Sequence, residues 1–190
     1  SSSSDREDCN ANVICDEGDD WRDQINGVIR VQMGGGLCSA SIVNNTANDR
    51  TPYVLFADHC VSGSASGFVF DFNYQSSTCN GTTGPLNQSV SGSTLLASQD
   101  INSGPDFALL EMTSNIPDEY DPFYVGWSRV GLAPSDAVGI HHPGGNIIWK
   151  AKGKDLKKVW EQYGVKWHLN NSHVMQHLKE FKVKENFNTK

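Results

Sequence analysis

Residues 1–146 contain short apolar runs separated by clusters of Gly, Asn, Ser and Asp. The runs are NGVIRVQM, SASIVNN, YVLFA, GFVFDFNY, DFALLEM and FYVGW. β-Branched and aromatic residues favour strands, whereas Gly, Asn and Asp favour the turns between them. Many short strands of this kind build a barrel or a sandwich. The pattern therefore predicts a mostly β fold for this part of the chain.

The composition of the chain changes at about residue 147. Residues 1–146 contain five Arg, no Lys and 18 acidic residues, a net charge of −13. Residues 147–190 contain ten Lys, no Arg and four acidic residues, a net charge of +6. Such an asymmetry indicates a boundary. We predict a disordered N-terminus over residues 1–8, a main domain over residues 9–146 and an unrelated Lys-rich tail over residues 147–190.

The tail, residues 147–190, has two helical apolar stripes with the alternating segment VKWHL between them. Its Lys and aromatic residues are compatible with nucleic-acid binding, but a small packed α/β fragment with a solvated basic face is favoured. His173 and His177 would share a helix face, yet HVMQH lacks the glutamate of the HExxH motif. We therefore favour solvated histidines over a metal site, and expect neither a metal nor a cofactor.

The cysteines favour disulfides over a zinc finger, because none forms a CxxC pair. They are Cys9, Cys15, Cys38, Cys60 and Cys79. Disulfides indicate an oxidising compartment, and the alternative is a cytosolic protein with unpaired thiols. Because the number is odd, at least one cysteine lacks an intrachain partner. No apolar run approaches the 18 residues of a membrane span. We expect a secreted protein without a membrane segment, and its signal peptide would already be removed because the first residues do not resemble one.

Two residues are candidates for chemistry, His59 after the apolar run of TPYVLFADHC and Asp106 before the run FALLEM. Taken alone, a surface histidine and a turn aspartate are the more common interpretations. The alternative is a catalytic pair, in which Asp106 accepts the Nδ1 proton of His59. A Cys38–Cys60 disulfide would fix the loop that carries His59, and loop closure of this length is worth about 3 kcal/mol.

Seven stretches occur in an order that resembles a known family. They are CNANVICDEGDDWRDQ, LCSASIVNNTANDRTPYVLFADHC, FDFNYQSSTCNG, SGSTLLASQD, PDFALLEM, YVGWSR and GIHHPGG. Over residues 9–146 they resemble the bacterial lysyl endopeptidase family of secreted serine proteases. The resemblance implies a chymotrypsin-like double β-barrel, with the first barrel present and the second incomplete, and a short α/β basic tail after it.

The resemblance also implies an activity and its residues. The activity is hydrolysis of peptide bonds in polypeptide substrates, after Lys, with His59 as general base and Asp106 as its orienting partner. It implies the disulfides Cys38–Cys60 and Cys15–Cys79. In the family, the first cysteine pairs with one near the C-terminal end, and this chain has no such residue. Cys9 is therefore predicted to be unpaired.

The sequence departs from the family where the nucleophile is expected. A family member continues after HHP to a Gly-Ser-Ser-Gly or Gly-Asp-Ser-Gly segment, which provides the nucleophile and the oxyanion hole, and no stretch here matches it. Ser172 is the only serine after residue 135, and no glycine flanks it to permit such a loop. Removing the nucleophile of a triad costs about 10⁶ in kcat. We predict an inactive chain. The alternatives are a non-catalytic homologue that binds peptides or proteins, and a chimera whose tail contacts nucleic acid.

Overall fold

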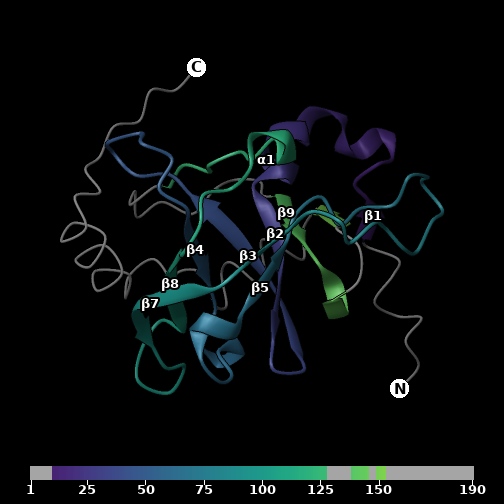
Figure 1. Ribbon diagram of the computed structural model, residues 1–190. Coiled ribbons are helices and arrows are strands. Elements are labelled where there is room, and N and C mark those ends of the chain that lie inside the picture. Colours follow the sequence, from purple (N-terminus) through teal and green to yellow (C-terminus); the bar gives the residue numbers. More distant parts are fainter. Residues whose placement is uncertain (1–9, 128–137, 146–148, 153–190) are drawn as a thin grey trace.

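The computed structural model describes residues 10–127, 138–145 and 149–152, which form two antiparallel sheets and several short helices (Figure 1). The larger sheet has seven strands in the order β6-β5-β2-β3-β4-β8-β7. Their bounds are β2 Val28–Met33, β3 Gly36–Val43, β4 Tyr53–Phe56, β5 Val69–Asp71, β6 Ser89–Ser91, β7 Ser93–Gln99 and β8 Phe107–Met112. This arrangement confirms the predicted mostly β class.

The larger sheet closes on itself at Gly92. The edge strands β6 and β7 follow each other along the chain with only Gly92 between them. The N–H of Gly92 donates to the carbonyl of Phe68 at 2.8 Å, and its own carbonyl accepts from the N–H of Thr113 at 3.1 Å. Gly92 therefore bonds to the segment before β5 on one side and to the residue after β8 on the other. A single bent strand thus completes the first barrel, which leaves no free edge between β6 and β7.

The barrel core follows the two-residue period of its strands, because successive side chains point to opposite faces of a sheet. Its buried members on the strands are Ile29, Val31, Met33, Ala40, Ile42, Val54, Phe56, Phe70, Val90, Ala108, Leu110 and Met112. The opposite face of β8 is buried as well, since Phe107 and Leu109 pack with Val43 and Tyr53 in a second cluster. Burial on both faces explains why FALLEM is apolar without alternation.

The smaller sheet has three strands in the order β1-β10-β9, namely β1 Asn10–Asn12, β10 Trp149–Lys152 and β9 Val138–His141. Strand β10 lies beyond the predicted boundary at residue 146, so four residues of the predicted tail pair with the main domain here. Residues 1–9, with Cys9, and residues 153–190, with Ser172, His173 and His177, lie outside the described residues. The boundary itself stays a prediction.

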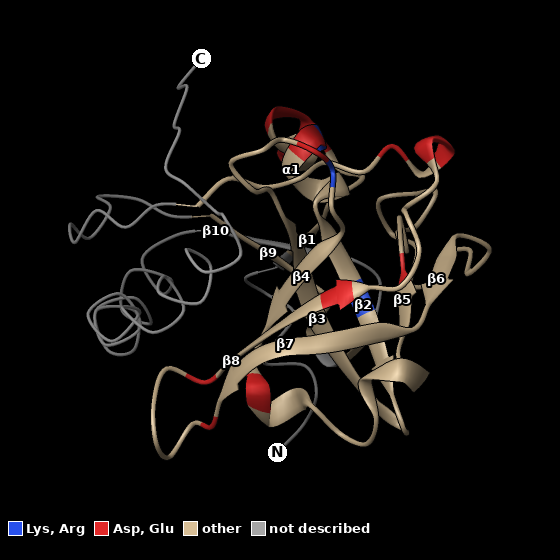
Figure 2. Ribbon diagram, turned by 60° about the vertical axis from the view of Figure 1, so that its left-hand side comes forward, with Lys and Arg blue, Asp and Glu red and all other residues tan. Residues whose placement is uncertain are grey.

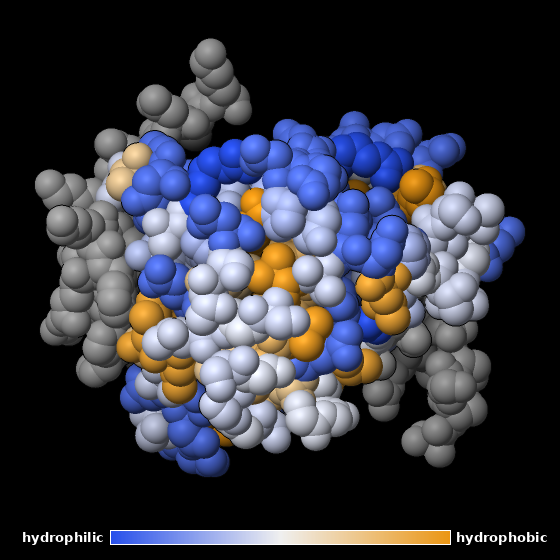
Figure 3. All heavy atoms as spheres, viewed as in Figure 1, coloured by the Kyte–Doolittle hydropathy of each residue, from blue (hydrophilic) through white to orange (hydrophobic). Residues whose placement is uncertain are grey.

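Six short helices connect the strands. They are η2 Asp16–Trp21, α1 Arg22–Asn26, η3 Asp58–Cys60, η4 Ala65–Gly67, η5 Asp118–Tyr120 and η6 Pro143–Gly145 among the residues described. On the face drawn in Figure 3, polar residues predominate and apolar residues form small separate patches. Scattered apolar residues of this kind are ordinary on a protein surface and do not indicate an interface.

A buried ion pair joins the barrel to the segment that carries β9. Arg30 on β2 faces Asp71 on β5, and its Nε and Nη2 donate to Asp71 Oδ2 at 2.9 and 2.7 Å. The two side chains are only 7% and 3% exposed. Nη1 of Arg30 donates to the carbonyl of Gly145 in η6 at 3.0 Å, and the guanidinium lies 4.0 Å from the ring centroid of Tyr74. One arginine therefore connects three separate segments of the chain.

Two further contacts hold the same segment against β3. The N–H of His142 donates to Ser39 Oγ at 2.7 Å, and its ring stacks on Tyr74 at 6.2 Å between centroids. Gly145 lies against Leu37 so closely that a Cβ would stand 2.4 Å from Leu37 Cδ1. Segment 138–145 is thereby fixed next to the residues that flank Cys38.

Replacing Arg30 by Met should lower the free energy of unfolding by about 3–5 kcal/mol, because Asp71 would stay buried without its cation. Replacing Arg30 by Met and Asp71 by Leu together should recover most of this loss. Denaturant unfolding measures both changes. Arg50→Met is the matched control, since Arg50 pairs with Asp118 at an exposed site and its loss should matter far less. An equal loss of unfolding free energy in the Arg30 and Arg50 variants would contradict the structural role of the buried Arg30–Asp71 pair.

Gly92→Ala should destabilise the barrel by about 1–3 kcal/mol, because φ at this residue is +88° and alanine rarely adopts it. The added Cβ would also stand 2.7 Å from Thr113 Oγ1. Gly67→Ala is the control, since no atom lies within 4 Å of its Cβ position. Thermal unfolding of both variants tests the closure. A Gly92 variant as stable as the Gly67 variant would refute it.

Candidate active site

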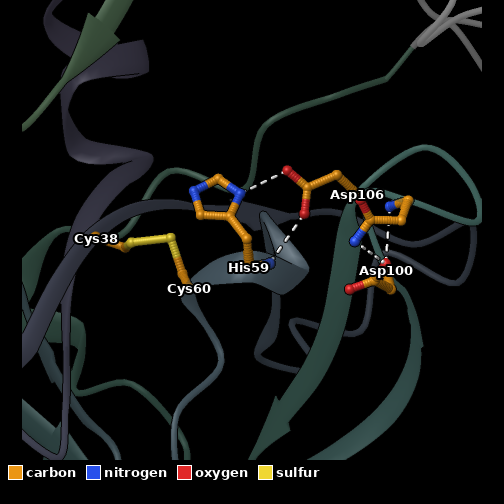
Figure 4. Close-up of polar contacts among 6 residues, drawn as sticks. Cys38, His59, Cys60, Asp100 and Asp106 are labelled. Carbon is orange, nitrogen blue, oxygen red and sulfur yellow. Dashed lines mark hydrogen bonds and ion pairs between the residues drawn. A yellow bond between two sulfur atoms is a disulfide. The ribbon is translucent and has the colours of Figure 1, made fainter.

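His59 lies in η3, directly after β4, and a disulfide braces it. Cys60, the next residue, is bonded to Cys38 on β3, with 6.3 Å between the two Cα atoms (Figure 4). The turn itself is closed by the N–H of Cys60, which donates to Ala57 O at 3.2 Å, and by the N–H of Val61, which donates to Asp58 O at 2.8 Å. The backbone of His59 is therefore fixed by a covalent bond and by hydrogen bonds on both sides.

Asp106 reaches His59 because β4 and β8 are antiparallel neighbours. Phe56, three residues before His59, pairs with Ala108, two residues after Asp106. Both carboxylate oxygens contact the histidine (Figure 4): Oδ2 lies 2.6 Å from Nδ1, and Oδ1 accepts the backbone N–H of His59 at 2.9 Å. The structure thus brings together the two residues that the sequence singles out.

The pair has the geometry of a base and its orienting carboxylate. A carboxylate is an acceptor, so Nδ1 of a neutral His59 carries the proton and Nε2, on the other side of the ring, carries the lone pair. The side chain of His59 is 57% exposed and that of Asp106 is 16% exposed. An accessible Nε2 can take a proton from a hydroxyl or a water molecule, and the carboxylate would then stabilise the imidazolium.

The backbone conformation of Asp106 was not predicted from the sequence. Asp106 has φ of +51°, in the left-handed region that aspartate tolerates better than most residues. The preceding turn is built on Asp100, whose Oδ1 accepts from the N–H and the Nδ2 of Asn102, at 2.7 and 2.9 Å (Figure 4). Its carbonyl accepts the N–H of Gly104 at 2.9 Å. The letters DINSGPD carry a turn signal, but they do not indicate the conformation of Asp106.

The second disulfide ties the N-terminal segment to the loop after β5. Cys15 and Cys79 are bonded, with 4.9 Å between their Cα atoms. Nearby, the buried Asn12 donates from Nδ2 to the carbonyls of Thr78 and Gly81, at 3.4 and 3.2 Å. Both pairings that the resemblance implies are therefore present. Cys9 lies outside the described residues.

Within the described ranges, no group of three His, Cys, Asp or Glu side chains is placed to hold a metal ion. Over the same residues, the structure contains no helix that is long and apolar enough to cross a membrane.

Residues 3–180 match the sequence model of a family described as "Lysyl endopeptidase, C-terminal domain". The chain belongs to the lysyl endopeptidase family. The match extends beyond the change in composition at residue 147. It covers most of the 190 residues, including the described strand β10.

Two solved structures also resemble this member of the lysyl endopeptidase family. One is the Rv3671c protease in an inactive form, with a TM-score of 0.40, 16% identity, and coverage of 66% of this chain and 49% of that chain. The other is the inactivated protease paralogue S-I1 of the scabies mite, with a TM-score of 0.49, 20% identity, and coverage of 75% and 67%. The chain thus spans about half the length of the Rv3671c protease chain that it matches.

The stability of the chain should fall as the pH is lowered below about 6.5, because burial lowers the pKa of His141 on β9 from its ordinary value of 6.5. His141 has its ordinary pKa in the unfolded chain and a lower pKa in the folded chain. Between these two pKa values the unfolded chain binds more protons than the folded chain, so acid favours unfolding until the folded side chain is also protonated. Denaturant unfolding at pH 7, 6 and 5 measures how steeply the free energy of unfolding depends on pH. His141→Gln should flatten this dependence, and an unchanged slope would contradict this account.

Proposed function

We propose that this chain carries the general-base half of a serine endopeptidase site. His59 acts as the base and Asp106 orients its ring, and polypeptides are the substrate class. The observation that carries the proposal is the double contact of Asp106, which uses one oxygen for Nδ1 and the other for the backbone N–H of His59. A carboxylate that only capped a turn would not need to fix both the ring and the backbone of one histidine.

The proposal includes the absence of useful peptidase activity in these 190 residues. They contain no Gly-Ser-Ser-Gly or Gly-Asp-Ser-Gly segment, and Ser172 lacks flanking glycines. An exposed base without a nucleophile and an oxyanion hole gives little rate enhancement. The preference for cleavage after Lys comes from the family name alone. The two disulfides support secretion, because such bonds persist in oxidising compartments.

A fluorophosphonate probe tests the inactivity, because it reacts with a serine that a neighbouring histidine activates. We expect no labelling of this chain under conditions that label an active lysyl endopeptidase completely. Ser172→Ala and His59→Ala are the controls for any weak signal. Labelling that disappears in both variants would identify Ser172 as a nucleophile and would refute the proposal.

A second candidate is a non-catalytic homologue that binds peptides or proteins. It is favoured by one observation, the retention of a braced and exposed His59 in a chain without the nucleophile segment. Titration of Lys-containing peptides, followed by the backbone amide NMR signals of residues that flank His59, distinguishes the two candidates. Saturable shifts that His59→Ala abolishes would favour the binding function.

The origin of the tail is also part of the proposal. The charge reversal at residue 147 supports a separate origin, whereas the pairing of β10 and the extent of the family match favour continuity for at least the first residues. Translation of the encoding DNA beyond codon 146 in all frames tests it. A Gly-Ser-rich segment with a late cysteine in another frame would establish that the tail is not the native continuation.

A further inference from the structure

The turn between β7 and β8 leads the chain into Asp106. Gln99 at the end of β7 pairs with Phe107 at the start of β8, so residues 100–106 form the connection. Figure 2 shows this turn as a loop beyond the ends of the two strands. Asp106 is its last residue, and the φ of +51° at Asp106 persists only where the surrounding structure enforces it. Phe107 in β8 constrains Asp106 on one side, so the turn has to constrain it on the other.

The side chain of Gln99 joins this turn to the sheet. Its Nε2 donates to the carbonyl of Ser103 at 3.0 Å. The same side chain lies over Gly104, where an added Cβ would stand 2.1 Å from Gln99 Cδ. Asp100 closes the turn internally, because its carbonyl accepts the N–H groups of Ser103 and Gly104 at 3.1 and 2.9 Å. Asp100 thus sets the shape of the turn, whereas Gln99 sets where the turn stands on the strands.

Little conformational freedom remains between the carbonyl of Ser103 and Asp106. Pro105 is buried, its ring fixes its own φ, and it restricts the backbone of Gly104 before it. A displacement of Ser103 is therefore passed on to Asp106. The carboxylate of Asp106 has to place two oxygens at once, Oδ2 at 2.6 Å from Nδ1 of His59 and Oδ1 at 2.9 Å from its backbone nitrogen. A small rotation of Asp106 would lengthen at least one of these contacts.

We propose that Gln99 is a positioning residue for Asp106 and, through it, for the ring of His59. This role rests on the proposed function, in which Asp106 orients His59. By holding the carbonyl of Ser103, Gln99 keeps the carboxylate of Asp106 aimed at both the ring and the backbone of His59. Without the amide donor, the turn stays closed by Asp100 but shifts on the strands. The proton of the neutral ring then distributes between Nδ1 and Nε2, and Nε2 is less often the free base.

Gln99→Met tests this role, because methionine keeps the length of the side chain and removes the donor. The readout is the pair of nitrogen NMR signals of the His59 ring in the full chain, at about pH 8.5, where an ordinary imidazole is neutral. The unmutated chain should carry the ring proton on Nδ1. In Gln99→Met we expect the ratio of the Nδ1–H to the Nε2–H tautomer to fall about two- to tenfold, as for the loss of one hydrogen bond. Hydrogen exchange of the His59 backbone amide should accelerate by a similar factor.

Two further variants separate the role of Gln99 from a general loss of stability. Gln88→Met is the matched control, since Gln88 Oε1 accepts from Asn73 Nδ2 at 2.7 Å in a different loop, and its loss should leave the His59 ring unchanged. Gly104→Ala should reproduce the result of Gln99→Met, because the added Cβ displaces the Gln99 side chain. His59→Gln identifies the His59 signals among the six histidines. Unchanged amide signals of β2 and β3 show that each variant is folded.

The possible outcomes distinguish this role from the proposed function. If the ring carries its proton on Nδ1 and neither Gln99→Met nor Gly104→Ala changes the tautomer ratio, the positioning role of Gln99 alone is overturned. An equal change in Gln88→Met would also overturn it, because a general loss of stability would then account for the effect. Asp106→Ala is the reference, in which the preference for the Nδ1–H tautomer should be lost. A ring that keeps this preference in Asp106→Ala would refute the proposed function and the positioning role together.

Discussion

The antiparallel pairing of β4 with β8 supports both the core and the candidate active site. It sets Phe56 opposite Ala108 inside the barrel, and the same register brings the residues beyond the strand ends, His59 and Asp106, into contact. A shift by one residue would turn the apolar side chains of β8 to the other face. Both faces of β8 are buried, each in a different cluster, so such a shift would exchange Ala108 with the much larger Phe107 and disrupt the packing of both clusters. The same β4–β8 register therefore determines both the packing of the core and the geometry of the candidate site.

The second structural requirement is the junction between the barrel and segment 138–145. Burying Arg30 and Asp71 costs desolvation energy, which an apolar pair of similar size would avoid. The arginine does something that an apolar residue could not, because its Nη1 also binds the carbonyl of Gly145. Together with Ser39, which accepts the N–H of His142, it holds the segment after β9 against the barrel.

Much of the site was predictable because its signals are local or belong to a recognisable family pattern. Five of the six apolar runs lie on β2, β3, β4, β5 and β8, whereas FYVGW forms only an isolated bridge between Val125 and Val43. His59 and Asp106 stand at strand ends as expected. Three features were not predictable. The closure at Gly92, the partner of Asp71 and the pairing of β1 with β10 each join residues that are distant in the sequence or depend on one backbone angle. No periodicity of a single segment encodes such contacts.

The sequence by itself determined the mostly β class, the cysteines available for disulfides, the two candidate residues and the absence of a nucleophile segment in these 190 residues. These features depend on residue type and on local pattern, which can be read one segment at a time. The tertiary structure decided that Asp106 uses both oxygens on His59, that Arg30 joins the barrel to η6, and that β10 is paired on both sides. Those outcomes depend on strand register and on left-handed backbone angles, which are fixed only when distant segments pack together.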